Sequence, residues 1–340
     1  MNTKKRRAAW PTVIGIAAAV IFLVIVGYLM ERSTGGASAS NPIKTVEEIL
    51  GLGNKQEAVV SFNGKQYRRN PDVKAYLFMG IDRTGEAQSS GSYNDGGQAD
   101  VQLLLVVDQA QESFRVLQIN RDTMTDVEVL GVHGDVIGTE YEQIALAHFY
   151  GNGLENSCEN TVRAVSNLLY GVDIDGYAAI NMEAIPILND MLGGVTVTVE
   201  DDFSQVDPTL IQGETVTLMG EQATHFIRNR FDVADGSNLS RMGRHRAYLH
   251  GFDEAFTAAA GEDKELVLKM YDAAHGYLVT DMGSGPISRL AQQCLGYENS
   301  GVITMEGEHR LGEVFMEFYP DENSLRQTIL DLFYIETATN

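Results

Sequence analysis

The chain has 340 residues, and its 47 acidic residues outnumber its 25 Lys and Arg residues, which gives a formal net charge of −22. Strong acidity of this kind aids solubility and argues against nonspecific binding to nucleic acids, so we expect no nucleic-acid partner. No Cys and His residues have the spacing of a zinc site. Cys158 and Cys294 could form one disulfide in an oxidising compartment or remain two buried free thiols, and the sequence leaves both readings open.

The N-terminal segment predicts a single membrane span. Four basic residues at positions 4–7 precede an uncharged run at 12–30. At about 1.5 Å per residue this run is long enough to cross a hydrocarbon core of ~30 Å as a helix. The basic residues favour a cytoplasmic location for residues 1–11, which places the rest of the chain outside. A cleaved signal peptide is the alternative, because Ala37-Ser38-Ala39 resembles a small-residue cleavage site.

Residues 31–57 are expected to form an extracytoplasmic linker, since residues 33–41 (STGGASASN) are small and polar. The remaining residues, 58–340, are enough for one large domain with a substantial core or for two small ones. At their start, residues 58–69 alternate around Asn63-Gly64, a pair that favours a type I′ turn. This pattern predicts a β-hairpin.

Three apolar runs follow, at residues 75–81, 101–107 and 114–120, and they suit strands that are buried on both faces. The second and third runs are separated by a turn that is too short for a parallel crossover, which needs about a dozen residues or more. If the second strand is antiparallel to both neighbours, one edge of the sheet collects the polar residues that flank the runs. These residues are Asp82, Arg83, Asp100, Arg121 and Asp122.

Downstream, helical and extended patterns alternate. Helices are predicted over residues 158–171, 182–192, 219–228, 237–261, 264–276, 287–297 and 322–334, and strands over 176–182, 193–200, 301–306 and 313–318. We expect Gly171 to end the first of these helices and Asn238 and Ser240 to cap the helix that begins near residue 237. Strands interleaved with helices predict an α/β sandwich with a mixed central sheet.

The segment from His225 to Arg246 concentrates positive charge in an otherwise acidic chain. It contains Arg228, Arg230, Arg241, Arg244 and Arg246, but no lysine. Arginine presents a rigid fork of donors that matches phosphate oxygens bidentately, so the segment predicts a site for a di- or polyphosphate. Two alternatives remain open: a solvated helix face paired with the surplus acids, and a basic strip that touches anionic lipid headgroups.

Asp82 and Asp100 are candidate metal ligands. An aspartate at a strand end is commonly a turn or cap residue. Two carboxylates on one edge, however, suit Mg²⁺, which binds one or two carboxylates together with substrate phosphates. The sequence contains no G-x-S-x-G, Walker A or dinucleotide-binding fingerprint, so those chemistries have no support.

The order of these motifs resembles the LytR–CpsA–Psr family. The motifs are LFMGIDR at 77–83, QADVQLLLVV at 98–107, INRDT at 119–123, LGGVTVTVE at 192–200, HFIRNR at 225–230 and SRMGRHR at 240–246. The tail FYPDENSLRQTILDLFY and the single N-terminal span are also similar to that family. The resemblance runs from about residue 58 to the C-terminus, over the whole predicted domain.

The resemblance implies a three-layer α/β/α fold that holds a polyprenyl pyrophosphate, with the lipid tail in an apolar groove. It implies a phosphotransferase that moves a lipid-linked glycopolymer, such as teichoic acid or capsular polysaccharide, onto peptidoglycan. The expected partners are therefore a polyprenyl-pyrophosphate-linked glycan, peptidoglycan and the membrane, which the N-terminal helix would cross. The metal-binding acids of the family map onto Asp82 and Asp100, with Mg²⁺ as the expected cofactor or Mn²⁺ in its place.

The resemblance and the residue chemistry together assign roles to single residues. Arg121 and Asp122 are the expected catalytic residues, with Asp122 as the candidate base. A peptidoglycan hydroxyl would attack the sugar-side phosphorus, and arginines would stabilise the charge that develops. The expected pyrophosphate-binding residues are Arg83, Arg121, Arg228, Arg230, Arg241, Arg244 and His245.

Three positions depart from the family pattern: Gln98 replaces an arginine, Asn120 a proline and His245 a glutamine. The Gln98 departure removes an expected phosphate contact, which Arg83 would replace. Two other functions therefore remain open. One is a non-catalytic sensor or assembly factor that binds a polyprenyl lipid, and the other is a polyprenyl-pyrophosphate hydrolase.

Overall fold

The structure is a computed structural model that describes residues 59–230, 232–263 and 265–337. The expected cytoplasmic segment, membrane span and linker, residues 1–57, lie outside the described residues. Within the described part of the chain, none of the helices combines the length and the apolar character that a membrane crossing requires.

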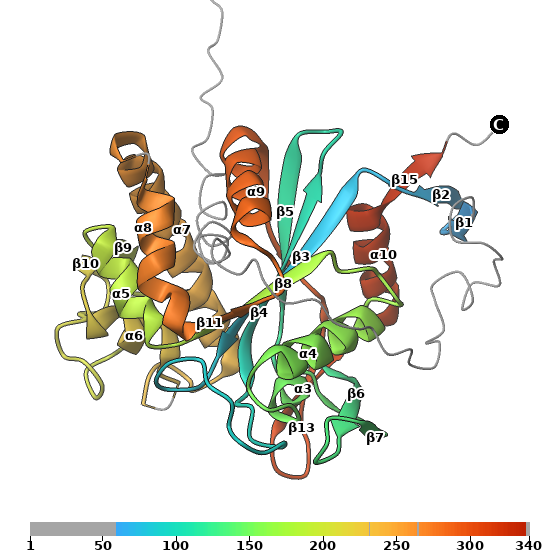
Figure 1. The fold of residues 1–340 in the computed structure, drawn as a ribbon, viewed down its shortest axis with the longest axis horizontal. Coiled ribbons are helices and arrows are strands. Elements are labelled where there is room, and N and C mark those ends of the chain that lie inside the picture. Colours follow the sequence, from blue (N-terminus) through green and yellow to red (C-terminus); the bar gives the residue numbers. More distant parts are fainter. Residues whose placement is uncertain (1–58, 231, 264, 338–340) are drawn as a thin grey trace, which may run out of the picture.

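A six-stranded mixed sheet forms the centre of the fold (Figure 1). In spatial order its strands are β11 (Leu278–Thr280), β8 (Gly176–Asn181), β3 (Val73–Ile81), β4 (Ala99–Asp108), β5 (Ser113–Ile119) and β12 (Glu298–Thr304). β4 runs antiparallel to both β3 and β5, whereas β8 is parallel to β3 and β12 is parallel to β5. The predicted mixed sheet is therefore present, and each of the three apolar runs contributes a strand.

Helices cover both faces of this sheet (Figure 1). One face carries α5 (Ala184–Met191), α6 (Glu221–Arg228), α7 (Asn238–Glu262), α8 (Leu266–Ala274) and α9 (Ser284–Gly296). The other face carries α3 (Leu146–Phe149), α4 (Glu155–Leu168) and α10 (Glu322–Phe333). Alternate residues of β4 enter the two cores, since Leu103 packs in the first and Leu104 in the second. Burial on both faces explains why these strands are apolar almost throughout.

The two cysteines belong to different cores. Cys158 on α4 and Cys294 on α9 are buried free thiols. They pack on opposite faces of the sheet. The sheet separates the two thiols, so they do not form the disulfide that the sequence left open.

The strand directions bring the predicted polar residues to one edge of the sheet. Ile81 pairs with Ala99, and Gln102 pairs with Ile119. The end of β3, the start of β4 and the end of β5 therefore lie together. This confirms the expectation, drawn from the short turn between β4 and β5, that the middle strand is antiparallel to both neighbours.

A β-bulge at this edge determines how Asp100 is presented. Gly80 pairs with Val101 and Ile81 pairs with Ala99, so the ladder shifts register and Asp100 is the extra residue. A bulge bends the strand and re-aims side chains, and bulges are common next to active sites. Asp100 thereby leaves the alternation that sends its neighbours into the two cores.

Smaller antiparallel sheets of two or three strands surround the central sheet in the described part of the chain. The hairpin predicted at residues 58–69 is confirmed, with positive φ values of 49° at Asn63 and 77° at Gly64. The strands outside the central sheet are β1 (Val59–Phe62), β2 (Lys65–Arg69), β6 (Met124–Leu130), β7 (Val136–Gln143), β9 (Val195–Thr198), β10 (Thr215–Leu218), β13 (Gly307–Leu311), β14 (Met316–Pro320) and β15 (Tyr334–Thr337). β6, β7, β10, β13 and β15 lie where the sequence predicted no strand, and so does β11 of the central sheet.

The N-cap of α7 differs from the prediction. The side chain of Ser237 accepts a hydrogen bond from the backbone N–H of Ser240 at 3.1 Å, so Ser237 is the cap. Asn238 and Ser240, the predicted caps, lie in the first turn and use their side chains elsewhere. Asn238 donates to Asn120 Oδ1 at 2.7 Å, and Ser240 donates to Asp201 Oδ2 at 3.0 Å.

Candidate functional site

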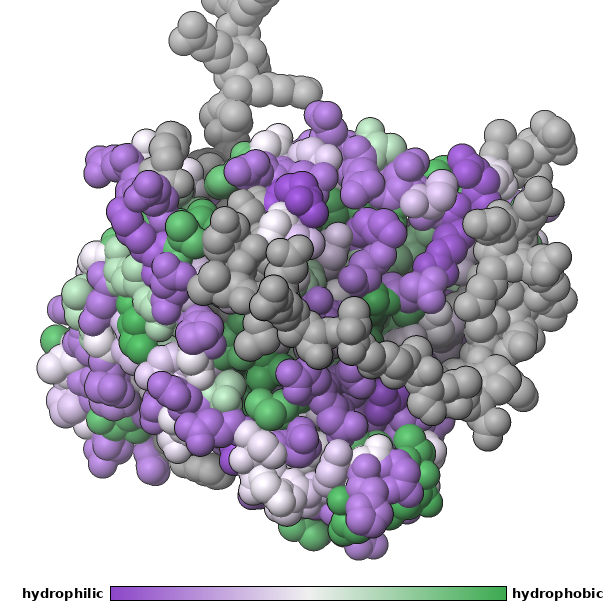
Figure 2. Space-filling model, in the orientation of Figure 1, coloured by the Kyte–Doolittle hydropathy of each residue, from purple (hydrophilic) through white to green (hydrophobic). Residues whose placement is uncertain are grey.

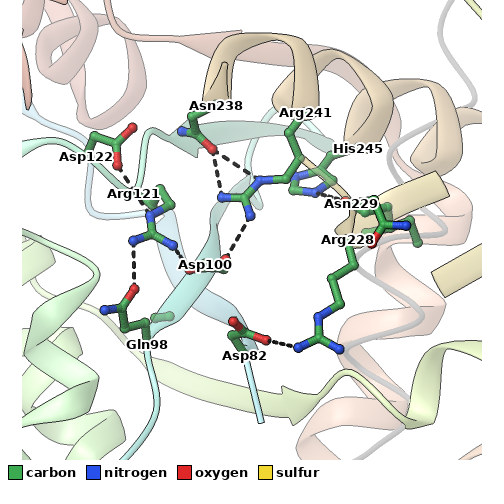
Figure 3. A network of polar contacts seen from close by, with 12 residues as sticks. Asp82, Gln98, Asp100, Arg121, Asp122, Arg228, Asn229, Asn238, Arg241 and His245 are labelled. Atoms are coloured by element: carbon green, nitrogen blue, oxygen red, sulfur yellow. Dashed lines mark hydrogen bonds and ion pairs between the residues drawn. The ribbon is translucent and has the colours of Figure 1, made fainter. Parts of the chain in front are cut away.

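Asp100 is the centre of the candidate site, because two arginines from distant parts of the chain share its carboxylate (Figure 3). Arg121, which follows β5, donates to Asp100 Oδ1, and Arg241, near the start of α7, donates to Oδ2 at 2.8 Å. The side chains of Asp100, Arg121 and Arg241 are 4%, 13% and 5% exposed. Removing one partner from so buried an ion pair costs about 3–5 kcal/mol. The predicted convergence of these three residues is present.

Two asparagines fix the guanidinium of Arg241. Asn238 Oδ1 accepts hydrogen bonds from Nε and Nη2 of Arg241 at 3.2 and 2.8 Å. Asn120 Oδ1 accepts from the amide of Asn238 and also from the backbone N–H of Asp122 at 2.9 Å. Asn120, which departs from the family pattern, therefore ties the end of β5 to the start of α7. The sequence interpretation named Asn120 only as a departure from the family pattern and Asn238 only as a cap, so it missed the bond between them.

Gln98 and Asp122 complete the surroundings of Arg121. Arg121 Nη2 donates to Gln98 Oε1 at 2.6 Å, and Arg121 Nε lies 3.3 Å from Asp122 Oδ1. Gln143 Nε2 donates to the same carboxylate oxygen at 3.3 Å. Gln98 therefore orients Arg121. The family pattern expects an arginine at position 98 instead.

Asp122 is buried at the end of β5. Burial raises the pKa of Asp122, while the positive charges of Arg121, Arg241 and Arg230 act in the opposite direction. Arg230 lines the same cavity as Arg121 and Asp122. Arg230 therefore belongs to the cluster, and a carboxylate with a raised pKa suits an exchange of protons with a substrate.

Asp82 and Arg228 form a second ion pair beside the first. Arg228 Nη2, at the end of α6, donates to Asp82 Oδ1 at 2.9 Å, and the two side chains are 43% and 40% exposed. Figure 3 shows Asp82, just after the end of β3, near Asp100 on β4, with arginines around them. An exposed pair of this kind contributes at most about 1 kcal/mol, so a ligand displaces it easily.

The structure places Arg244 outside the cluster, against the expectation that it binds pyrophosphate. Its Nε donates to the carbonyl of Phe226 at 2.9 Å, its Nη1 donates to Asp201 Oδ2 at 2.7 Å, and its Nη2 donates to the carbonyl of Asn229. The side chain is 5% exposed. Since these carbonyls belong to the segment that carries two site arginines, Arg244 positions that segment.

His245 is a buried neutral residue, which contradicts its expected role as a pyrophosphate ligand. Its Nε2–H donates to the carbonyl of Ile227 at 3.1 Å. Burial, with the charge of Arg241 as the next cause, lowers the pKa of His245 to about 3. The ring therefore carries no charge that would attract a phosphate, and it lines an apolar cavity instead.

Arg83 also packs away from the cluster, so it does not supply the phosphate contact that the family pattern expects at position 98. A Cβ atom added to Gly97 would lie 2.5 Å from Cγ of Arg83, and one added to Gly153 would lie 2.5 Å from Nη1. The side chain thus covers two glycines on the α4 side of the sheet edge. Its Nη1 is buried there without a hydrogen-bond partner.

An apolar cavity begins beside the cluster. β4 and α7 contribute to both sites: Asp100 and Arg241 lie in the cluster, whereas Val101 and Tyr248 line the cavity. The other lining residues are Gly80, Leu103, Ile180, Met182, Ile185, Ile227, His245, Leu249 and Phe252. A cavity with such a lining suits a hydrocarbon chain.

The donor set at the sheet edge fits Mg²⁺. No group of three or more His, Cys, Asp or Glu residues in the described part of the chain is arranged to hold a metal ion. Mg²⁺ does not require one, because it binds one or two carboxylates together with water and phosphate oxygens. Asp82, which directly follows β3, and Asp100, on the adjacent β4, supply that number of carboxylates.

The fold and the site define an α/β protein with a cluster of arginines and aspartates beside an apolar cavity. Residues 38–329, most of the chain, match the model of the LytR_cpsA_psr family. The chain belongs to the LytR–CpsA–Psr family, as the motif order indicated.

Several relatives bear the name polyisoprenyl-teichoic acid–peptidoglycan teichoic acid transferase TagU. The protein from Bacillus subtilis (strain 168) is 27% identical over 235 residues, which are 67% of this chain and 67% of that protein. The protein from Oceanobacillus iheyensis is 26% identical over 307 residues, which are 89% of this chain and 87% of that protein.

Solved structures share the fold. A structure of TagT bound to LIIa-WTA has a TM-score of 0.57 at 20% identity, over 77% of this chain and 90% of that chain. A crystal structure of B. subtilis TagU has a TM-score of 0.53 at 21% identity, over 77% of this chain and 95% of that chain. The central mixed sheet is therefore the sheet of this family.

Proposed function

We propose that this protein is a phosphotransferase that moves a glycopolymer from a polyprenyl-pyrophosphate carrier to peptidoglycan. The observation that carries this proposal is that β4 and α7 each run from the charged cluster into the apolar cavity. A polyprenyl pyrophosphate has the same two ends, one anionic and one apolar. The names of the relatives support this reaction, and a membrane span at residues 12–30 would keep the domain beside its lipid substrate.

Arginines do most of the binding in this mechanism. Arg121, Arg228, Arg230 and Arg241 hold the pyrophosphate, since each guanidinium presents several donors to phosphate oxygens. Gln98, Asn238 and the contacts of Arg244 fix these side chains before substrate arrives. Phosphoryl transfer depends chiefly on positioning and on charge stabilisation, which a fixed set of guanidinium groups provides.

The charge balance of the cluster supports a divalent cation. Four guanidinium groups face the carboxylates of Asp82, Asp100 and Asp122, so little surplus positive charge remains for a pyrophosphate. We propose that Asp82 and Asp100 hold Mg²⁺, or Mn²⁺ in its place, which would neutralise charge on the leaving phosphate. The arginines that now pair with these two carboxylates would then donate to phosphate oxygens.

Asp122 is the proposed base. A hydroxyl of the peptidoglycan acceptor forms a bond to the sugar-side phosphorus and gives its proton to the carboxylate of Asp122. The bond from that phosphorus to the bridging oxygen breaks, and polyprenyl phosphate leaves with the electron pair. The raised pKa of Asp122, caused by its burial, makes the carboxylate a better proton acceptor than an exposed aspartate.

One reaction mixture tests the proposal. The full-length protein in detergent would be incubated with a lipid-linked oligosaccharide, Mg²⁺ and peptidoglycan oligomers. We expect a phosphodiester-linked conjugate of glycan and peptidoglycan. Phosphorylated glycan released to water as the only product would show a hydrolase instead, and lipid that is bound but unchanged would show a non-catalytic binding protein.

A further inference from the structure

A second hollow, of about 690 Å³, opens beside the cluster and has a lining separate from that of the cavity proposed for the lipid tail. Its polar floor includes Arg121, Asp122 and Arg230. One wall is the start of α7, and the other is the turn between β13 and β14. We call this cavity the β13–β14 hollow.

The wall that β13 and β14 form is both apolar and exposed. Leu311, Val314, Phe315 and Met316 are 76%, 72%, 68% and 43% exposed. Figure 2 shows apolar side chains at the lower end of the molecule, where Figure 1 places the β13 and β6–β7 hairpins. Gln143, on β7, donates to the carbonyl of Met316 at 2.6 Å. This bond holds the apolar wall next to the polar floor of the hollow. Large apolar side chains that border convergent polar groups are typical of a ligand-binding surface.

The charged cluster adjoins both this hollow and the apolar cavity. The two cavities share no lining residue. Arg121 and Asp122 face the hollow, whereas Val101, the residue after Asp100, faces the apolar cavity. A substrate held by the cluster is therefore within reach of two separate cavities, one apolar and one with a polar floor.

Given the proposed function, on which this inference rests, the arrangement sets the direction from which an acceptor approaches. In phosphoryl transfer the attacking and leaving oxygens lie roughly in line through the phosphorus. If the lipid tail occupies the apolar cavity, the leaving lipid phosphate points toward Val101 and Tyr248. The attacking hydroxyl then comes from the hollow, where the Asp122 carboxylate takes its proton.

We propose that the β13–β14 hollow docks the acceptor, a glycan strand of peptidoglycan. A sugar ring has an apolar C–H face, which packs on side chains such as Phe315, and hydroxyls, which bond to a polar floor. The floor and rim offer such partners in Gln143, Ser237 and Asn238. The exposed hairpin continues the wall beyond the cavity, as a polymeric acceptor requires.

The charges around the hollow favour this acceptor over the other two occupants that an apolar wall suggests. Glu313 and Glu317 lie on or beside the hairpin turn, and Asp235 lines the hollow. These carboxylates repel the anionic headgroups of a membrane surface and also an anionic donor polymer. They attract the free amines of peptide stems on the acceptor.

A matched pair of surface variants tests the proposal in the full-length protein in detergent. Val314→Ser combined with Phe315→Ser removes apolar side chains from the wall. Val132→Ser is the control, because Val132 is 78% exposed in the β6–β7 turn and does not line the hollow. We expect the double variant to bind peptidoglycan oligomers at least tenfold more weakly by calorimetry, and to show a matching rise in acceptor KM. Its affinity for the lipid-linked donor should match that of the wild type, and Val132→Ser should change neither affinity.

Four outcomes would overturn the docking proposal, and a fifth would separate it from the proposed reaction. Equal acceptor affinity in the double variant and the wild type would remove the wall from acceptor binding, and an equal loss in Val132→Ser would show a nonspecific surface effect. Loss of donor affinity alone would place the donor glycan in the hollow. Weaker sedimentation of the double variant with vesicles of phosphatidylethanolamine and phosphatidylglycerol, with unchanged oligomer binding, would identify a membrane contact. If wild-type protein binds oligomers through the hollow but forms no conjugate, the proposed reaction fails while the docking site stands.

Discussion

Asp82 and Asp100 carry the same functional group in different surroundings, so single substitutions separate their chemical and structural roles. We expect Asp82→Asn and Asp100→Asn each to lower transfer by about 10²-fold or more, because each weakens the proposed metal site. Only Asp100→Asn should lower the free energy of unfolding, by about 3 kcal/mol, since it takes the paired carboxylate from the buried Arg241 and leaves Arg121 with Asp122 alone. Asp82→Asn should change the free energy of unfolding by less than about 1 kcal/mol, because the ion pair of Asp82 with Arg228 is exposed.

Transfer assays and urea unfolding, followed by circular dichroism, measure the two effects. Asp272→Asn is a suitable control, because Asp272 is an exposed residue of α8, a helix of the apolar core beyond the cluster. Full transfer by the Asp82→Asn protein would exclude Asp82 as a metal ligand. Similar losses of stability in the Asp82 and Asp100 variants would contradict a structural role set by burial.

Asp122 should control the pH dependence of the reaction at acid pH. Burial raises the pKa of Asp122 against the opposing charge of Arg121, so a proton stays on the carboxylate to higher pH than on an exposed aspartate. The kcat of the wild type should therefore rise with pH through that raised pKa and then level off. Asp122→Asn should lower kcat by about 10²-fold and remove this acid limb, while Asp235→Asn at the rim of the hollow should retain it.

The effect of Asp122 on stability has the opposite sign from that of a paired aspartate. The folded protein binds this proton more tightly than the unfolded chain does, so ionisation of Asp122 subtracts stability as the pH rises. Asp122→Asn should therefore not lower the free energy of unfolding at neutral pH. A clear destabilisation there would show that the ion pair with Arg121 outweighs the burial of the carboxylate.

At the scale of elements, the end of α6 depends on α7. Arg244 and His245 donate to the carbonyls of Phe226, Ile227 and Asn229, which flank the positions of the site arginines Arg228 and Arg230. These bonds satisfy carbonyls that have no partner within the helix. One turn of α7 therefore sets the position of a segment that the proposed mechanism uses to hold pyrophosphate.

Arg244→Gln should loosen this segment without removing any group that contacts substrate. We expect faster amide hydrogen exchange in residues 226–230 and a donor KM raised about tenfold, with a smaller change in kcat. Arg246→Gln is the matched control, because Arg246 lies on the same helix and donates to Gln118 rather than to α6. An unchanged exchange pattern would show that the segment holds its position without Arg244.

Strand order and direction at the site were predictable, because a short turn forbids a parallel crossover and apolar runs mark buried strands. The direction in which a single long side chain points was not predictable. Arg241 and Arg244 share a helix face, yet one reaches Asp100 and the other reaches α6, since neighbouring elements decide which acceptors are in range. The β7 strand escaped prediction because it is exposed on both faces and its burial shows no alternation.

At the scale of the whole molecule, each face of the sheet buries a neutral histidine next to the site. His148 packs beside Cys158 on the α4 face, and His245 lines the apolar cavity on the α7 face. Burial lowers the pKa of His148 to about 4 and that of His245 to about 3. His148 Nδ1 contacts the carbonyl of Gly97, and His245 Nε2 contacts the carbonyl of Ile227. Both rings therefore hold in place backbone segments that lead into the cluster.

These histidines should make the fold sensitive to mild acid. In the unfolded chain each titrates near pH 6.5, so between that value and about pH 4 the unfolded state binds protons that the folded state excludes. The stabilisation from the lowered pKa is therefore complete above about pH 6.5 and is lost as the pH falls. Each histidine contributes up to about 1.4 kcal/mol per pH unit, so the free energy of unfolding should fall by roughly 2 to 4 kcal/mol from about pH 7 to pH 5.

Urea unfolding of the full-length protein across this range measures the slope, and His245→Gln separates the two contributions. Glutamine cannot be protonated and retains an N–H donor for the carbonyl of Ile227, so the variant should show about half the wild-type slope. His133→Gln is the control, since His133 is exposed in the β6–β7 turn and belongs to neither core. A slope that His245→Gln leaves unchanged would mean that the ring becomes protonated within the folded protein, which would require the α7 layer to open.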